Sequence, residues 1–112
     1  MADGTPKDRR RHERVSVEIW VEETRGRELY YLRAANLSRG GVFLENTIPH
    51  PYGTLVELEF TLPGDRERLH VRGRVVDRPE MADRLGMAVE FIEMEPAVAR
   101  KIEEFVEAGP PI

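Results

Sequence analysis

The stretch Asn36-Leu37-Ser38-Arg39-Gly40-Gly41 lies between two apolar runs, residues 30–35 and 42–44. Both runs are rich in residue types that favour strands. Gly tolerates a positive φ angle and lets another group approach the backbone closely, while Asn and Ser bond to nearby backbone in turns. The stretch is therefore predicted to be a tight turn that joins two strands.

On both sides of this turn, apolar and polar residues alternate with a period of two, which is typical of half-buried strands. The first strand places Val17, Ile19 and Val21 on one face and Trp20 on the other. The six predicted strands are residues 15–22, 28–35, 42–45, 56–62, 69–76 and 85–91. Turns and loops rich in Gly and Pro separate them. This pattern predicts a small antiparallel β-barrel or sandwich over residues 15–92.

The period changes at Pro96, where Val98, Ile102, Phe105 and Val106 fall on one face of a helix. Proline suits the first position of a helix, and glycine and proline after residue 108 end it. A helix over residues 96–107 is expected to pack its apolar stripe against one end or face of the sheet. We expect residues 1–8 and 108–112 to be tails of a single domain.

Composition excludes several classes of protein. The chain has 112 residues, no cysteine, and no apolar run long enough to span a membrane. The first residues lack the apolar segment of a secretory signal, so we expect a soluble cytoplasmic protein with no membrane insertion. Residues 7–14 carry a net charge of +3 within a total of −4. A basic arm on an acidic body indicates a local anion site rather than a surface for DNA or RNA.

The sequence contains no recognisable combination of residues for a catalytic site or a metal site. The three histidines, His12, His50 and His70, are scattered without a metal-ligand spacing and are predicted to be ordinary surface residues. Ser38 could form a triad with His70 and Asp77 on paper, but it lacks the strand-to-helix elbow of the hydrolases. We therefore expect neither catalysis nor a cofactor.

The basic arm, residues 9–14, contains Arg9, Arg10, Arg11 and Arg14 just before the first strand. The planar guanidinium matches phosphate oxygens bidentately, stacks on flat rings and reads the O6/N7 edge of guanine. The arm could therefore clamp a guanine nucleotide by base and phosphate together. The alternative from the residues alone is a solvated basic tail.

Together these features resemble a known family. Arg10 and Arg14 resemble the RxxxR motif of PilZ domains, and the stretch from Asn36 to Gly41 resembles their (D/N)xSxxG motif. Residues 85–91, followed by an amphipathic helix, are similar to the end of such a domain. The resemblance covers about residues 9–107. It implies an all-β fold, a six-stranded antiparallel barrel with one C-terminal helix, and a receptor for the bacterial second messenger cyclic di-GMP.

The resemblance also implies roles for single residues. Arg10 and Arg14 would bind phosphates and contact the guanines, and Arg9 would influence whether one nucleotide or a stacked pair is bound. Asn36 and Ser38 would bond the guanine edge and phosphate. The expected ligand-binding set is completed by the glycines of the motif, Gly40 and Gly41, of which Gly41 would keep the backbone clear of the base. Asn36 stands where many members have Asp, and it brings an amide donor without a charge.

The residues also allow two other functions. A PilZ-like adaptor for motility or secretion machinery would bind a protein and no nucleotide, and Trp20, Tyr30 and Tyr31 could serve its interface. A nucleic-acid-binding barrel would use aromatic residues for stacking, but the acidic body argues against it. The downstream partner is not identified by the sequence. Motility and biofilm output are expectations for the family as a whole.

Overall fold

The computed structural model describes residues 14–77 and 85–109. Arg9, Arg10 and Arg11 of the basic arm and both predicted tails, except Ala108 and Gly109, lie outside these ranges. No helix within the described ranges is long and apolar enough to cross a membrane.

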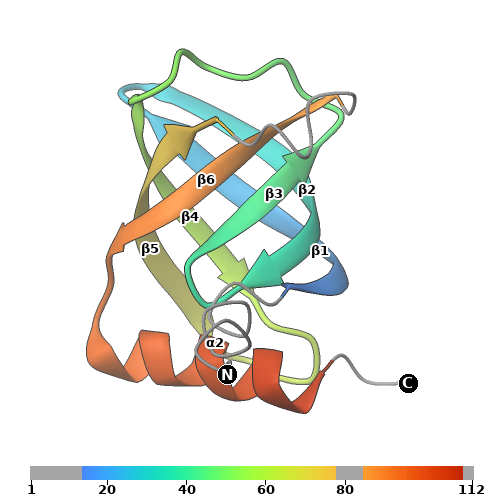
Figure 1. Cartoon of the computed structure of the whole chain (residues 1–112). Helices are drawn as coiled ribbons and strands as arrows, with labels where there is room; N and C mark the ends of the chain where they lie inside the picture. Colours follow the sequence, from blue (N-terminus) through green and yellow to red (C-terminus); the bar gives the residue numbers. More distant parts are fainter. Residues whose placement is uncertain (1–13, 78–84, 110–112) are drawn as a thin grey trace, which may run out of the picture.

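Six strands form a closed antiparallel barrel (Figure 1), with neighbours in the order β1-β2-β3-β6-β5-β4. Their bounds are β1 Arg14–Arg25, β2 Glu28–Ser38, β3 Gly41–Glu45, β4 Leu55–Thr61, β5 Arg68–Val76 and β6 Gly86–Glu93. One helix, α2 at Pro96–Ala108, follows β6. The predicted all-β barrel with a C-terminal helix is confirmed, because the period-two alternation supplies each strand with one face for a shared core.

The prediction that residues 36–41 form a turn is wrong for its first half. Asn36 and Leu37 belong to β2 and pair on both sides, with Ser16 and Val15 of β1 and with Phe43 and Val42 of β3. Cross-strand pairing satisfies backbone groups that a turn would leave to side chains or water. Only residues 39 and 40 lie between the two strands.

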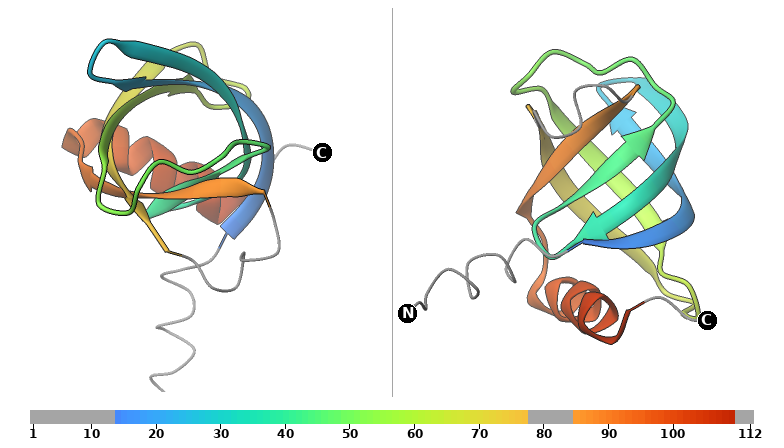
Figure 2. Two further views of the ribbon diagram at one scale, coloured as in Figure 1. Left: turned by 90° about the horizontal axis from the view of Figure 1, so that it is seen from above. Right: turned by 45° about the vertical axis from the view of Figure 1, so that its right-hand side comes forward.

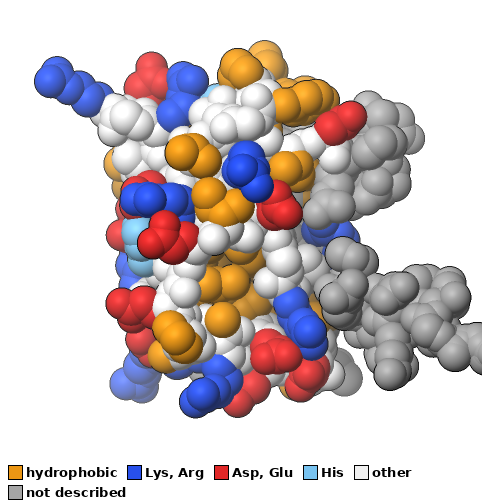
Figure 3. Space-filling view, turned by 60° about the vertical axis from the view of Figure 1, so that its left-hand side comes forward, with side chains coloured by type: hydrophobic (Ala, Val, Ile, Leu, Met, Phe, Trp, Pro, Cys, Tyr) orange, Lys and Arg blue, Asp and Glu red, His pale blue; other side chains and the backbone are white. Residues whose placement is uncertain are grey.

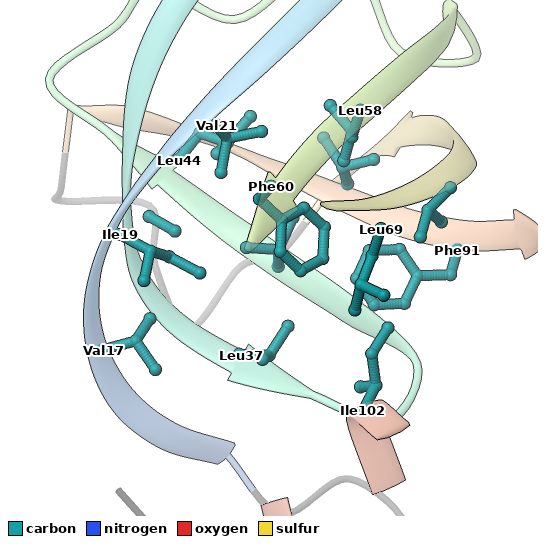
Figure 4. Close-up of a cluster of buried hydrophobic side chains, with 14 of the residues drawn as sticks. Val17, Ile19, Val21, Leu37, Leu44, Leu58, Phe60, Leu69, Phe91 and Ile102 are labelled. Carbon is teal, nitrogen blue, oxygen red and sulfur yellow. The ribbon is translucent and has the colours of Figure 1, made fainter. Parts of the chain in front are cut away.

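The core consists of the inward side chains of all six strands together with one face of α2 (Figure 4). Phe60, Leu58 and Leu69 are among the largest fully buried side chains. Burial of each such side chain contributes about 1.5–3 kcal/mol. Ile102 reaches from α2 toward Leu69, so the helix completes the core at one end of the barrel.

Helix α2 lies across that end (Figure 2) and begins and ends where the sequence predicts to within one residue. Pro96 stands in its first turn, and Gly109, with φ 80°, donates its N–H to the carbonyl of Phe105. Two further contacts hold the helix to the barrel. The Lys101 Nζ lies 2.7 Å from Asp65 Oδ2 in the β4–β5 turn, and Arg39 forms the second contact, described with the site below.

The opposite end of the barrel contains a buried contact between a carboxyl group and a histidine, which the sequence analysis missed. Glu23 is completely buried, and one carboxylate oxygen lies 3.0 Å from His50 Nε2. The ring of His50 packs on Tyr30, with ring centroids 5.4 Å apart. Burial raises the pKa of the Glu23 carboxyl, and His50 opposes this effect. The prediction that His50 is an ordinary surface histidine is therefore wrong, because its half-buried ring is the hydrogen-bond partner of a carboxyl group that has left water.

The outer face of β5 carries a row of cationic side chains matched by carboxylates on both neighbouring strands. Arg72 contacts Glu57 of β4 at 3.1 Å and Glu93 of β6 at 3.2 Å, and Arg74 contacts Glu90 at 3.3 Å. Figure 3 shows how positive and negative side chains intermingle on one face of the molecule. Such matched charges leave no extended positive stripe on this part of the barrel.

Candidate functional site

The two sequence motifs meet where β1 begins. Arg14 is the first residue of β1, and its Cα pairs with that of Ser38 near the end of β2. The Arg14 Nη1 donates a hydrogen bond to Asn36 Oδ1 at 2.5 Å. Antiparallel pairing thus brings the last arginine of the RxxxR pattern into contact with the first residue of the NxSxxG pattern.

Two β-bulges turn Asn36 away from the barrel core, although the residue stays 9% exposed. The register of β2 against β3 shifts between Ala34 and Asn36, and the register of β1 against β2 shifts at the same level. Ala34 and Leu37 both belong to the core, although strict alternation would place them on opposite faces. The extra residue in β2 resolves this conflict and directs Asn36 outward, next to Arg14.

Ser38 shapes the bend between β2 and β3. Its buried Oγ accepts the N–H of Gly40 at 3.2 Å and donates to the carbonyl of Gly41 at 3.3 Å. A hydroxyl has one proton and two lone pairs. With its proton engaged by Gly41, Ser38 has one lone pair left, which suits an N–H of a ligand. A phosphate oxygen would require the hydroxyl proton to turn away from Gly41.

The two glycines of the motif have different surroundings. A Cβ at Gly41 would lie 2.4 Å from the carbonyl oxygen of Val89 in β6, whereas a Cβ at Gly40 would meet nothing within 4 Å. Gly41 is buried and Gly40 is exposed. Neither has a positive φ. Gly41 is therefore required for close packing of β3 on β6, and the open side of Gly40 is where another molecule could approach the backbone.

Gly40 also connects the bend to β6, because its carbonyl accepts the N–H of Phe91 at 2.8 Å. On the same side of the barrel, a Cβ at Gly86 would lie 2.3 Å from the Phe43 ring. Phe43 is buried although it lies outside the core cluster, and it pairs with Asn36 across β2 and β3. The glycine in the predicted segment 85–91 thus makes room for an aromatic ring beside Asn36.

Arg39 is a residue of the motif whose contact the sequence could not reveal. Its Nη1 lies 2.9 Å from Glu103 Oε2 and 3.9 Å from Glu107 Oε2, both on α2. The bend is thereby tied to the helix. All three side chains are partly exposed, so the pairs contribute about 0–1 kcal/mol each.

The site combines one guanidinium with uncharged polar groups. The hydrogen bond from Arg14 goes to the neutral amide of Asn36. Within the described ranges, no group of three His, Asp or Glu residues is placed to hold a metal ion. Arg14, Asn36, Ser38 and Gly40 are brought together here, while Arg9 and Arg10 lie outside the described residues. The ligand-binding roles of all these residues, and of Gly41, stay predictions.

Comparisons with known proteins agree with this architecture. The model of the PilZ domain family matches residues 8–108. No curated protein sequence matches. Among solved structures, the chain is similar to the inhibitor of motility MotI/DgrA of Bacillus subtilis, with a TM-score of 0.72 and 16% sequence identity. The match covers 85% of this chain and 48% of that one, so the present chain spans about half the length of its structural neighbour. At this identity the likeness shows the fold alone.

Proposed function

The chain belongs to the PilZ domain family, and from this premise we propose that it is a cytoplasmic receptor for cyclic di-GMP. The dinucleotide binds between the basic arm, with Arg9, Arg10 and Arg14, and the outer side of the bend at Asn36, Ser38, Gly40 and Gly41. The receptor then passes its state to a partner protein, and it catalyses no reaction. The contact between Arg14 and Asn36 is the observation that carries this proposal, since it brings the last residue of one motif against the first residue of the other.

The chemistry of the site suits this ligand. Cyclic di-GMP has two phosphates and two guanines, and arginine forks bind both phosphate oxygens and the O6/N7 edge of guanine. The Oδ1 of Asn36 already accepts from Arg14. Its amide NH₂ supplies donors for O6 or N7. The remaining lone pair of Ser38 accepts from a guanine N–H. The exposed side of Gly40 leaves space for a flat base.

An adaptor that binds a protein and no nucleotide is the second candidate. It is favoured by large aromatic side chains exposed on the barrel, Trp20 and Tyr31. A PilZ neighbour described as an inhibitor of motility is consistent with an output in motility for either candidate. The two candidates differ in one respect, the binding of cyclic di-GMP.

Thermal unfolding with and without cyclic di-GMP tests the proposal, with GMP as the control ligand. A ligand present at 100 times its Kd stabilises the native state by about 2.7 kcal/mol. We expect a rise in Tm that is specific to the cyclic dinucleotide and absent in Arg10→Ala and Arg14→Ala. Arg27→Ala is the matched control, because Arg27 is exposed at the other end of the β1–β2 hairpin. No shift at millimolar cyclic di-GMP would exclude the receptor and leave the adaptor.

A further inference from the structure

The outer face of the β1–β2 hairpin exposes two large aromatic side chains. Trp20 is 66% exposed and Tyr31 is 62% exposed. Trp20 pairs with Arg33, and Tyr31 pairs with Glu22. The two aromatics are thus diagonal neighbours on one face, about 7–8 Å apart. Exposed Trp and Tyr are the residue types that most often contribute the main binding energy at protein interfaces.

A pocket of about 530 Å³ lies along the same strands, lined among others by Glu18, Arg33, Glu45 and Pro63. The Arg33 guanidinium lies 3.0 Å from Glu18 and 3.4 Å from Glu45. Two carboxylates therefore surround one cation, which leaves the pocket with a net negative charge.

On the other side of Trp20, carboxylates again outnumber cations. Arg68 lies 2.8 Å from Glu22 of β1 and 3.1 Å from Glu59 of β4. The aromatic pair is therefore flanked on both sides by clusters that each hold two carboxylates and one guanidinium. Such a surface attracts cations and repels phosphates.

We propose that the outer face of β1 and β2, comprising Trp20, Tyr31 and the pocket at Glu18 and Glu45, is the docking surface for a protein segment. This segment carries Arg or Lys side chains next to an apolar residue. A guanidinium of the partner stacks on Trp20, a second cation enters the pocket between Glu18 and Glu45, and the apolar residue covers Tyr31.

This inference rests on the proposed function, for which it names the chemistry of the downstream partner. The surface and the candidate nucleotide site share the β1–β2 ladder. Ser16 and Ala35 line the pocket, while Ser16 is the cross-strand partner of Asn36 and Ala35 precedes it. A change in the position of Asn36 on nucleotide binding therefore acts directly on the edge of the docking surface.

Selection of binders from a displayed library of random 12-residue peptides tests the inference without a known partner. The selected peptides are then titrated against the protein by fluorescence. Trp20 is the single tryptophan of the chain, so its emission reports on this surface alone. The variants are Trp20→Ala, with binding followed by a label on the peptide, and Glu18→Lys with Glu45→Lys. Tyr52→Ala is the matched control, because Tyr52 is equally exposed at 66% but lies in the loop before β4.

We expect enriched peptides with a net positive charge and a blue shift of the Trp20 emission on binding. Trp20→Ala and the double lysine variant are expected to weaken binding about tenfold or more, and Tyr52→Ala less than about twofold. Selection of acidic or uncharged peptides, no enrichment, or binding that is indifferent to Trp20→Ala would overturn the inference. So would binding of a phosphate-rich oligonucleotide in preference to the peptides.

Binding of cyclic di-GMP is measured on the same proteins, so that the two proposals can fail separately. Trp20→Ala should bind the nucleotide like the unchanged protein, because Trp20 is not among the residues of the nucleotide site. Nucleotide binding without basic peptide binders would exclude the docking surface only. Basic peptide binders without nucleotide binding would exclude the receptor and leave the surface in place.

Discussion

Arg14 and Asn36 are 22 positions apart in the chain, yet the Arg14 Nη1 donates a hydrogen bond of 2.5 Å to Asn36 Oδ1. The contact exists because Arg14 begins β1 directly opposite the end of β2 and a bulge turns Asn36 outward. It joins the basic arm to the barrel at the point where we place the ligand. It therefore has consequences for both stability and binding.

Asn36→Ala is expected to lower the free energy of unfolding by about 1.5–3 kcal/mol, because a hydrogen bond to a charged group is lost from a nearly buried position. Urea unfolding monitored by circular dichroism measures this change. Ser16→Ala is the control, since Ser16 is the exposed cross-strand partner of Asn36. Equal stability of the two variants would mean that the contact with Arg14 contributes nothing.

Alanine substitutions at the two glycines of the motif are expected to differ in their effect on stability. Gly41→Ala places a Cβ 2.4 Å from the Val89 carbonyl oxygen and is expected to cost about 1–3 kcal/mol of stability. Gly40→Ala meets no atom within 4 Å and should leave stability unchanged within about 0.5 kcal/mol. If a guanine approaches this bend, Gly40→Ala should nevertheless weaken cyclic di-GMP binding. Calorimetric titration measures the nucleotide affinity of both variants, and urea unfolding measures their stability. A Gly41→Ala protein as stable as the unchanged protein would contradict the packing argument.

The buried pair of Glu23 and His50 predicts a pH dependence of stability. Burial raises the pKa of Glu23 above its ordinary value of 4.5. The folded protein then holds this proton more tightly than the unfolded chain does. The stabilisation from protonated Glu23 is complete below pH 4.5 and is lost as the pH rises through the raised pKa.

Glu23→Gln removes this titration while it keeps the shape of the side chain. Relative to the variant, the unchanged protein should therefore lose stability as the pH rises above 4.5 and through the raised pKa of Glu23. Urea unfolding at several pH values measures the difference, with Glu59→Gln on the barrel surface as the control. Parallel curves for the unchanged protein and Glu23→Gln would show that burial does not govern this carboxyl.

Arg39 predicts a weak coupling between the bend and α2. A double-mutant cycle with Arg39→Ala and Glu103→Ala should give an interaction energy of about 0.2–1 kcal/mol, as for other exposed ion pairs. Amide hydrogen exchange of the last turn of α2 should become faster in Arg39→Ala. Lys101→Ala, which releases the helix from the β4–β5 turn instead, provides the comparison. Unchanged exchange in Arg39→Ala would mean that core packing alone holds this end of the helix.

Much of the fold was predictable because its signals are local. The alternation of Val17, Ile19 and Val21 with polar residues specifies a strand with one buried face, and the spacing of Val98, Ile102 and Val106 specifies the buried face of the helix. The candidate site was predictable as a set of residue types, since Arg14 and Asn36 belong to motifs that resemble a family. Each of these inferences depends on neighbours a few positions apart.

The sequence by itself determined the six strands and the closing helix, and it predicts the candidate ligand-binding residues. Only the tertiary structure decided that Asn36 and Ser38 belong to a strand, that Gly41 is needed for packing on Val89, and that His50 is the hydrogen-bond partner of Glu23. It also decided that Trp20 and Tyr31 share one exposed face. These features depend on which strands become neighbours and in which register, and a single bulge changes the face on which a side chain lies. That choice is made by the collective packing of the barrel, to which residues far apart in the chain contribute together.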